Sequence, residues 1–182
     1  HSTNIYREGL KSKTYHRDKF KRCADKGIQL IQIWEDWIMN RPESVRALLL
    51  SKLHIYDKTI YARHCTVKVI KNPKQFLDDN HIQGSCPAAY SYGLYHGNEL
   101  VSVMTFGKRS SLISGSQTEC ELLRYCCARG TRIIGGASKL FKAFMREHRP
   151  YTVVSFSSND ISMGQLYESL GFVSDKTIKG SY

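Results

Sequence analysis

The chain has 182 residues, of which 41% are hydrophobic, so it can bury the core of one ordinary domain, or of one domain with a small appendage. Its 27 Lys and Arg outnumber its 16 Asp and Glu, and the resulting charge of +11 favours a polyanionic partner, most simply nucleic acid, over a merely soluble basic protein. No apolar run reaches the ~20 residues that span a bilayer, and no signal peptide is recognised, so we expect an intracellular protein.

The six cysteines form no C-x-x-C pair, which argues against a zinc ribbon. Several lie within apolar runs, where a free cysteine behaves as a small buried hydrophobic residue. We therefore expect reduced thiols. The cysteines are Cys23, Cys65, Cys86, Cys120, Cys126 and Cys127.

The first half of the chain predicts helix, strand and helix after a polar, basic start. The predicted elements are a helix over 14–26, a strand over 28–34 and a helix over 42–52. The strand is apolar and β-branched, and it ends abruptly at Glu35 and Asp36. Residues 41–59 are the candidate boundary region between two domains.

The second half predicts a mixed α/β arrangement. Its predicted elements are an extended stretch over 60–70 that is broken in two, a short helix over 72–79, a hairpin of strands 89–96 and 99–106, a strand over 119–128, a helix over 135–148, a strand over 151–157, a helix over 162–170 and a strand from 172. The hairpin turn is Gly97-Asn98. Residues 107–118 form a Gly/Ser loop that carries Lys108 and Arg109.

The turn that opens the helix over 135–148 is the candidate phosphate site. It has the sequence Arg132-Ile-Ile-Gly135-Gly136-Ala137. A glycine turn at a helix start directs free N–H groups and the positive end of the helix dipole at one point, which suits a phosphate or pyrophosphate. Cationic side chains lie near it in sequence: Lys108, Arg109, Arg124, Arg129, Arg132 and Lys139.

The second half resembles the GNAT acyltransferase fold in its order of elements and in two motifs. Arg132, Gly135 and Ala137 match the family signature Arg/Gln-x-x-Gly-x-Gly/Ala, and Tyr167 lies in a later Leu-Tyr-Glu-Ser-Leu-Gly-Phe segment. The resemblance covers residues 59–182. It implies that the turn holds the pyrophosphate of acetyl-CoA and that Tyr167 is a general acid for the departing thiolate.

Three alternatives to this interpretation stay open. Glycine turns open many helices, and Tyr167 is also explained as a core aromatic residue. No clear general base is found, since Glu119 and Glu121 are the only acids close to the turn in sequence. The same turn and its cations also suit a DNA backbone. The hairpin tyrosines, Tyr90, Tyr92 and Tyr95, then stack on unpaired bases, or else simply pack within the sheet.

The first half resembles the end of a Vsr-like nuclease fold. The segment from His16-Arg17-Asp18-Lys19 to Ile33-Trp34-Glu35-Asp36 is similar to phage homing endonucleases of the EDxHD type, in which a GNAT-like half follows the nuclease half. Segments of the second half, including 80–84 and 134–141, are similar to that phage group too. The predicted fold is therefore α/β (α+β): residues 1–58 are the C-terminal part of a Vsr-like nuclease domain with a linker helix, and residues 59–182 are a GNAT-like domain.

The nuclease resemblance implies a metal site. Carboxylates at the end of a strand suit Mg²⁺, so Glu35 and Asp36 are the candidate ligands, with Glu35 also counted as catalytic. His1 and His16 are candidates for proton transfer. The alternative is that the two acids form a solvated helix start. The family's main catalytic acid belongs before His1, so we expect that this chain does not cut DNA unaided.

The sequence therefore predicts the DNA-binding part of a phage-type Vsr-like homing or repair endonuclease, with DNA as partner and Mg²⁺ as cofactor. The alternative function is a GNAT acyltransferase that uses acetyl-CoA, with DNA bases among the candidate acceptors. A third hypothesis is a non-catalytic module that docks on nucleic acid or on an acidic protein.

Overall fold

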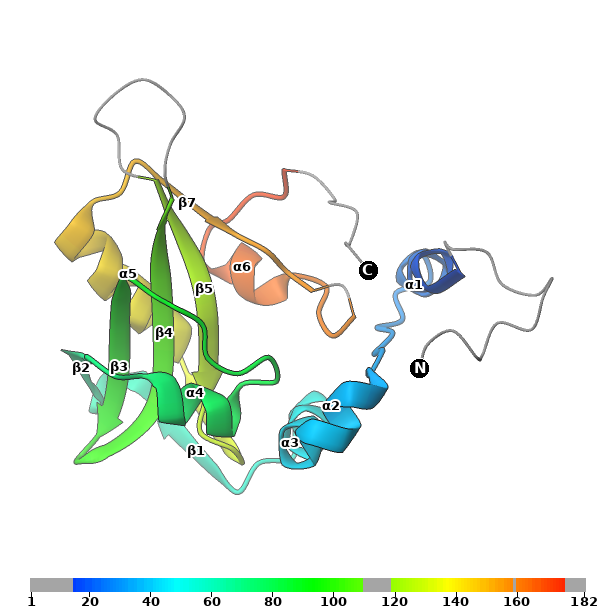
Figure 1. Cartoon of the computed structure of the whole chain (residues 1–182), viewed down its shortest axis with the longest axis horizontal. Coiled ribbons are helices and arrows are strands. Elements are labelled where there is room, and N and C mark those ends of the chain that lie inside the picture. Colours follow the sequence, from blue (N-terminus) through cyan, green and yellow to red (C-terminus); the bar gives the residue numbers. More distant parts are fainter. Residues whose placement is uncertain (1–14, 110–118, 159, 176–182) are drawn as a thin grey trace. The chain divides into compact units, whose positions relative to one another are not determined.

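The computed structural model describes residues 15–109, 119–158 and 160–175 (Figure 1). The chain divides into two compact units. The smaller unit comprises His1–Ile33 and Ser157–Gly164, and the larger one comprises Trp34–Phe156 and Gln165–Tyr182. The predicted boundary between residues 58 and 59 stays a prediction. No helix in the described ranges is long and apolar enough to cross a membrane.

Among its described residues, the smaller unit contains one helix, α1 (Tyr15–Ala24), where the sequence predicted a helix over 14–26. The strand predicted over 28–34 is wrong, because these residues join no strand ladder. Instead, the Gln32 N–H donates to the carbonyl of Asp160 at 2.7 Å and the Gln29 amide donates to that of Ile161 at 3.2 Å. An apolar, β-branched run forms a strand only where a partner strand can take its hydrogen bonds.

The larger unit is built on a five-stranded mixed sheet in the order β2-β3-β4-β5-β7. The strands are β2 (Thr66–Val69), β3 (Tyr90–His96), β4 (Glu99–Arg109), β5 (Glu119–Cys127) and β7 (Thr152–Ser155). Neighbours from β2 to β5 are antiparallel, whereas β5 and β7 are parallel. The predicted hairpin is confirmed, since His96 pairs with Glu99 across the two-residue turn.

A second, two-stranded ladder is parallel and joins β1 (Lys58–Tyr61) to β6 (Thr131–Ile134). The break predicted within 60–70 is confirmed, because a 3₁₀ turn, η1 (Ala62–His64), separates β1 from β2. Strand β6 was not predicted from the sequence, and the strand predicted from 172 is not formed by the described residues 172–175. Strand β4 also extends to Arg109 where a loop was predicted.

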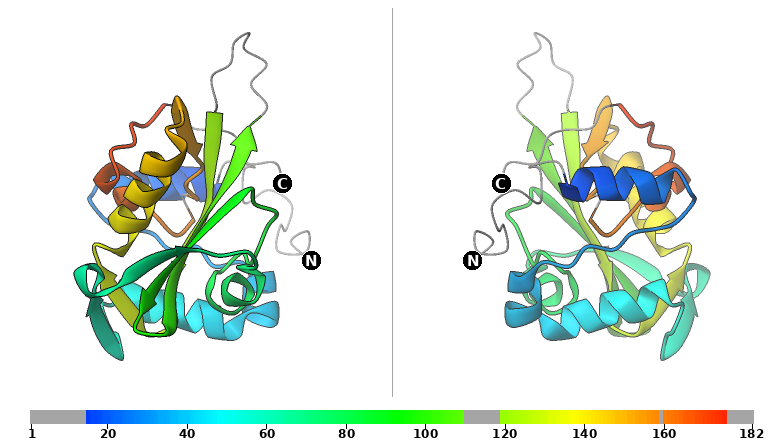
Figure 2. Two further views of the ribbon diagram at one scale, coloured as in Figure 1. Left: turned by 90° about the vertical axis from the view of Figure 1, so that its left-hand side faces the viewer. Right: turned by 90° about the vertical axis from the view of Figure 1, so that its right-hand side faces the viewer.

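Helices cover both faces of the sheet. The helices of this unit are α2 (Glu35–Asn40), α3 (Pro42–Lys52), α4 (Lys74–Asn80), α5 (Gly136–His148) and α6 (Gln165–Ser169). Helices α4 and α5 lie on opposite faces (Figure 2). Helix α5 buries Ala137, Leu140 and Phe144, whose spacing is that of one helix face.

The core lies between α5 and the sheet. The rings of Phe106 on β4 and Phe144 on α5 stack at 3.6 Å with an interplanar angle of 7°. Beside them, the buried Tyr92 donates its hydroxyl to Glu147 Oε2 at 2.8 Å and lies 2.8 Å from His148 Nε2. Burial and the Glu147 carboxylate raise the pKa of Tyr92 well above its usual value, so the phenol stays neutral.

Replacing Phe144 with alanine tests this packing. Because the side chain is fully buried in the ring stack, Phe144→Ala should lower the free energy of unfolding by about 3–5 kcal/mol, through lost transfer energy and a cavity. Phe144→Leu keeps most of the volume and should lose less than about 1.5 kcal/mol. Urea denaturation measures both, and a loss below about 1 kcal/mol for Phe144→Ala would contradict the packing described.

Candidate functional site

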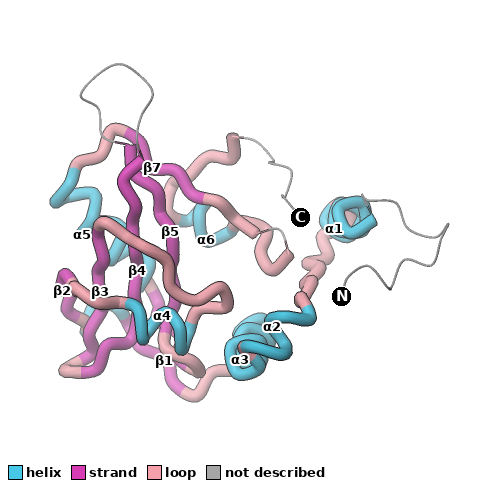
Figure 3. The backbone as a smooth tube through the Cα atoms, viewed as in Figure 1, coloured by secondary structure: helices cyan, strands magenta, loops and turns pink. Residues whose placement is uncertain are grey.

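The two parallel strands of the sheet separate part-way along their length (Figure 3). Strands β5 and β7 pair only from Glu119–Thr152 to Leu122–Ser155. At the last pair, the Ser155 hydroxyl donates to the Leu122 carbonyl at 2.9 Å. Beyond it, β5 continues to Cys127 beside β4 but has no strand neighbour on its β7 side among the described residues.

A bulge in β5 marks the same point. Phe106 of β4 pairs with Leu122, whereas the preceding residue, Thr105, pairs with Arg124, so Leu123 is an extra residue on β5. A bulge bends its strand and increases the local twist. The bulge and the end of the β5–β7 ladder together open a gap between the two strands at the C-terminal half of β5.

The predicted glycine turn begins α5. Gly135 is exposed and adopts the left-handed conformation at φ +78°, and no side chain caps this helix start. A Cβ on Gly136 would lie 2.8 Å from Ile133 Cγ2 and 3.2 Å from the Tyr125 hydroxyl, so the backbone here packs directly on β5 and β6. No side chain therefore occupies the first N–H groups of this 13-residue helix, and the binding of an anion there stays a prediction.

The predicted cations do not all gather at this turn. Lys139 Nζ donates to the carbonyls of Ala62, at 2.8 Å, and Cys65, so it fastens η1 to α5. Arg132 is exposed on β6, with its guanidinium 5.8 Å from the Tyr56 ring centre. Of the six predicted cations, Arg132 lies close to the turn and makes no such carbonyl contact in the described part of the chain.

The other four predicted cations lie elsewhere. Lys108 and Arg109 pair in register with Cys120 and Glu119, at the opposite end of β5 from the turn and about 25 Å from it at the rise of a strand. Arg124 donates to the Gly84 carbonyl at 3.1 Å, and Arg129 donates to the Ser44 hydroxyl at 3.3 Å. The structure therefore does not bring these four of the six predicted cations to the turn.

Tyr167 lies close to the point where the strands separate. It is half-buried on α6, its ring contacts Phe172 edge-on at 5.7 Å, and its hydroxyl donates to the Phe156 carbonyl at 3.4 Å. Phe156 is the first residue after β7. The phenol thus combines one packed edge with a weakly held hydroxyl, which fits both a general acid and the alternative of a core aromatic residue.

The two acids noted on β5 lie just before the bulge. Leu122 faces α5 in the core, so Glu119 and Glu121, which alternate with it, face the opposite side of the sheet. Glu121 is half-buried and precedes the last β5–β7 pair by one residue. It is therefore the carboxylate nearest in register to the gap.

Thiols behind the turn are not nucleophiles. Burial raises the pKa values of Cys126 and Cys127, and the Tyr125 hydroxyl, whose pKa is also raised by burial, lies 3.4 Å from Cys127 Sγ. These groups stay protonated at neutral pH. The free, reduced cysteines that the sequence predicted agree with the described thiols, none of which forms a disulfide there.

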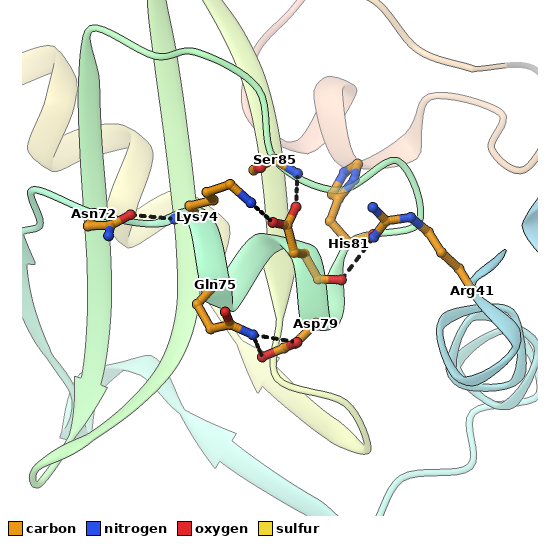
Figure 4. A network of polar contacts seen from close by, with 8 residues as sticks. Arg41, Asn72, Lys74, Gln75, Asp79, His81 and Ser85 are labelled. Atoms are coloured by element: carbon orange, nitrogen blue, oxygen red, sulfur yellow. Dashed lines mark hydrogen bonds and ion pairs between the residues drawn. The ribbon is translucent and has the colours of Figure 1, made fainter.

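The α4 face carries a polar cluster that sequence reasoning missed (Figure 4). Asp78 accepts from Lys74 Nζ at 2.6 Å and from the Ser85 N–H at 2.8 Å, and these contacts lower its pKa. Arg41 Nη1 donates to the Asp78 carbonyl at 2.8 Å. The cluster ties α3, α4 and the following loop together, and no local motif signals it.

His81 ends this cluster as a neutral imidazole. Burial, with the nearby Arg124 and Arg41 charges, lowers the pKa of His81 to about 4. Its Nδ1 accepts from the Gln83 N–H at 3.1 Å. The ring therefore faces the α4 side of β5 without a charge at neutral pH.

The tyrosine rings that were predicted to stack on bases mostly pack against other side chains of the protein. Tyr92 is buried, and Tyr90 packs against Phe144 and His148, at 5.9 Å and 4.0 Å between ring centres. The ring of Tyr95 is covered by Lys68 Nζ at 4.7 Å. The alternative of ordinary strand packing therefore describes these tyrosines.

The residues predicted for metal-dependent chemistry do not form a metal centre in the described ranges. Glu35 and Asp36 are exposed in the first turn of α2, as the helix-start alternative predicts. Their negative charges there interact favourably with the positive end of the helix dipole. His16 is on α1, with Nδ1 2.9 Å from Gln32 Oε1, and His1 lies outside the described residues. Within those residues no three potential ligands cluster, so Mg²⁺ is not supported.

Two solved structures with a similar fold are acetyltransferases. A ribosomal-protein-alanine N-acetyltransferase from Brucella melitensis biovar Abortus 2308 matches with a TM-score of 0.50 at 14% identity, over 65% of this chain and 98% of its own. An aminoglycoside acetyltransferase from an uncultured soil metagenomic sample matches with a TM-score of 0.52 at 14% identity, over 66% and 95%. No protein-family model and no curated protein sequence matches the chain.

The comparisons support a GNAT-like mixed α/β domain and correct the predicted function. Both similar structures are acetyltransferases, so the prediction of an endonuclease is wrong, and neither a Vsr-like fold nor a phage origin is supported. The strand on which the nuclease resemblance depended is also missing from residues 28–34.

The lowered pKa of His81 predicts a pH-dependent stability. In the unfolded chain His81 has a pKa near 6.5, so on acidification the unfolded state binds a proton first, and the stability present above pH ~6.5 is lost as the pH falls towards about 4. The loss is about 3 kcal/mol at pH 4, at about 1.4 kcal/mol per unit of pKa. Urea denaturation at several pH values should show a shallower dependence for His81→Gln than for the wild type. Parallel curves would contradict the assignment.

Proposed function

We propose that the larger unit is an acyltransferase that uses an acyl-CoA donor, most simply acetyl-CoA. The proposal rests on two structural features that follow each other along the chain. The gap between β5 and β7 opens towards the C-terminal end of β5, and the uncapped glycine turn follows that end after the short β6. An elongated thioester with a pyrophosphate at one end fits such a pair of features.

The turn would hold the phosphates. Its N–H groups and helix dipole supply a positive potential without a side chain, and Gly136 lets the backbone lie against β5 because a Cβ would meet Ile133 and Tyr125. Exposed Arg132 adds a formal charge nearby. The extended pantetheine arm would then follow the β7-side edge of β5 beyond Leu122, where no strand competes for it within the described residues.

Acetyl-CoA would supply an acyl group activated as a thioester, whose transfer to an acceptor releases the CoA thiolate. Tyr167, beside the gap, is the proposed proton donor to that thiolate, since a phenol and a thiol have similar acidities. Glu121 is the proposed acceptor of the proton that an incoming amine loses. It faces the side of the sheet opposite α5, from which we infer that the acceptor approaches.

Placing a charge at the turn tests donor binding. Gly135→Asp puts a carboxylate where the phosphates bind, whereas Gly135→Asn is nearly the same size and also tolerates a positive φ. We expect Gly135→Asp to weaken acetyl-CoA binding at least about tenfold relative to Gly135→Asn, because like charges repel at a site built for an anion. Isothermal titration calorimetry gives both affinities, and a melting-temperature increase with acetyl-CoA gives an independent readout.

Equal affinities for the two variants would place the phosphates elsewhere. No binding of acetyl-CoA by the wild-type protein at millimolar concentration would remove the proposal altogether. Thermal melting without ligand shows whether either variant is destabilised.

Removing the Tyr167 hydroxyl tests the chemical step. With the best acceptor from a panel of small primary amines, Tyr167→Phe should lower kcat for thiol release by about 100-fold and change KM for acetyl-CoA little, as expected for a lost general acid. A core role alone would instead lower the free energy of unfolding, which urea denaturation measures, and leave kcat of the folded enzyme unchanged.

A further inference from the structure

The outer face of α5 carries an open groove of about 650 Å³ that the acyl-transfer proposal does not use. Four of its five lining residues are cationic. The lining residues are Lys139, Lys142, Met145, Arg146 and Arg149. Apart from Met145, their spacing of three, four and three residues places them in one stripe along the helix, about 15 Å long at 1.5 Å per residue.

The stripe keeps its positive charge. Cations three or four residues apart on a helix repel each other and destabilise it by roughly 0.2–0.5 kcal/mol per pair. The one carboxylate of α5, Glu147, accepts from the Tyr92 hydroxyl instead. Lys142, Arg146 and Arg149 are exposed, and none of them has an ion pair with a carboxylate in the described part of the chain.

Arg149 has a backbone conformation that is unfavourable for a residue with a side chain. It ends α5 in the left-handed region, at φ +43° and ψ +51°, where helices usually have glycine, and its N–H donates to the Met145 carbonyl at 3.1 Å. Its successor is Pro150, which further restricts the preceding backbone. A side chain here costs stability, and it adds the last charge of the stripe.

The features beside the groove favour a nucleic acid. Tyr151, two residues after Arg149, is 70% exposed, as an aromatic ring that stacks on an unpaired base would be. A membrane would require an apolar helix face beside the cations, yet the apolar face of α5 is buried as Leu140 and Phe144. The stripe, about 15 Å long, can contact more than one phosphate along the backbone of an extended strand.

We propose that the α5 groove binds the phosphate backbone of a single-stranded nucleic acid, with Tyr151 stacking on a base next to it. Lys142, Arg146 and Arg149 neutralise phosphates, whereas Lys139 adds charge while it holds the carbonyls of Ala62 and Cys65. The interaction needs neither a metal nor acyl transfer, and it involves no strand cleavage.

Fluorescence anisotropy with a short labelled oligothymidylate tests the groove. Binding should weaken steeply between about 50 and 200 mM salt, because each neutralised phosphate of a single strand contributes about −0.7 to the slope of log K against log salt. In Lys142→Gln/Arg146→Gln, the affinity should fall at least about tenfold and the slope should lose about 1.4 in magnitude. Tyr151→Leu should weaken oligothymidylate binding while leaving the slope unchanged.

The matched control is Arg46→Gln/Lys71→Gln, which removes two exposed cations that do not line the groove. It should change the affinity by no more than about twofold. Equal losses in both double variants would show that net charge alone attracts the oligonucleotide, and that result overturns the proposal. Absence of binding at the lower salt concentration does so too.

Arg149→Gly separates binding from folding. Glycine relieves the left-handed backbone, so the variant should melt at a higher temperature and yet bind oligothymidylate more weakly. Acetyl-CoA distinguishes the two proposals. If saturating acetyl-CoA displaces the oligonucleotide and Lys142→Gln/Arg146→Gln weakens acetyl-CoA equally, the groove belongs to the donor site and the nucleic-acid proposal fails. A chain that binds no acetyl-CoA can still bind oligothymidylate.

Discussion

The direct contact between the first turn of α5 and the sheet is the constraint on which the candidate site depends. Gly136 lies so close to Ile133 and Tyr125 that one additional carbon would overlap them. This contact fixes where the helix begins, and with it the direction in which the uncapped N–H groups point. The stacked rings of Phe106 and Phe144 hold the same helix further along. The phosphate-binding geometry therefore follows from packing, with no dedicated side chain.

The two faces of the sheet have different characters. On the α5 face, the groups behind the glycine turn are apolar or neutral, since burial keeps the Tyr125 phenol and the Cys126 and Cys127 thiols protonated. On the α4 face, guanidinium groups of Arg41 and Arg124 donate to main-chain carbonyls around a neutral imidazole. A donor and an acceptor that approach from opposite faces would thus meet different electrostatic surroundings at the gap between β5 and β7.

Local signals in the sequence predicted the hairpin at Gly97-Asn98 and the glycine turn before α5, because alternation, turn residues and a 3.6-residue period are encoded within short segments. Features that depend on distant partners were not predicted. Strand β6 exists only because β1, seventy residues earlier, pairs with it, and the run over 28–34 lacks such a partner. His81 takes its environment from α3 and β5. Lys139 was assigned to phosphate from proximity in sequence, although carbonyls of η1 hold it. The resemblance of the first half to a nuclease led to the wrong predicted function, because residues 28–34 form no strand that could position Glu35 and Asp36.

The bulge at Leu123 has an evolutionary consequence. The gap arises from the number of residues in β5, and the identity of the side chain at that position matters less. Substitutions there would leave the opening in place, whereas loss of a single codon would restore regular pairing with β4, with Arg124 still opposite Thr105, and remove the bend in the strand. Selection for the opening would therefore be visible as a conserved length between Leu122 and Gly135 across related chains, even where the intervening residues vary freely.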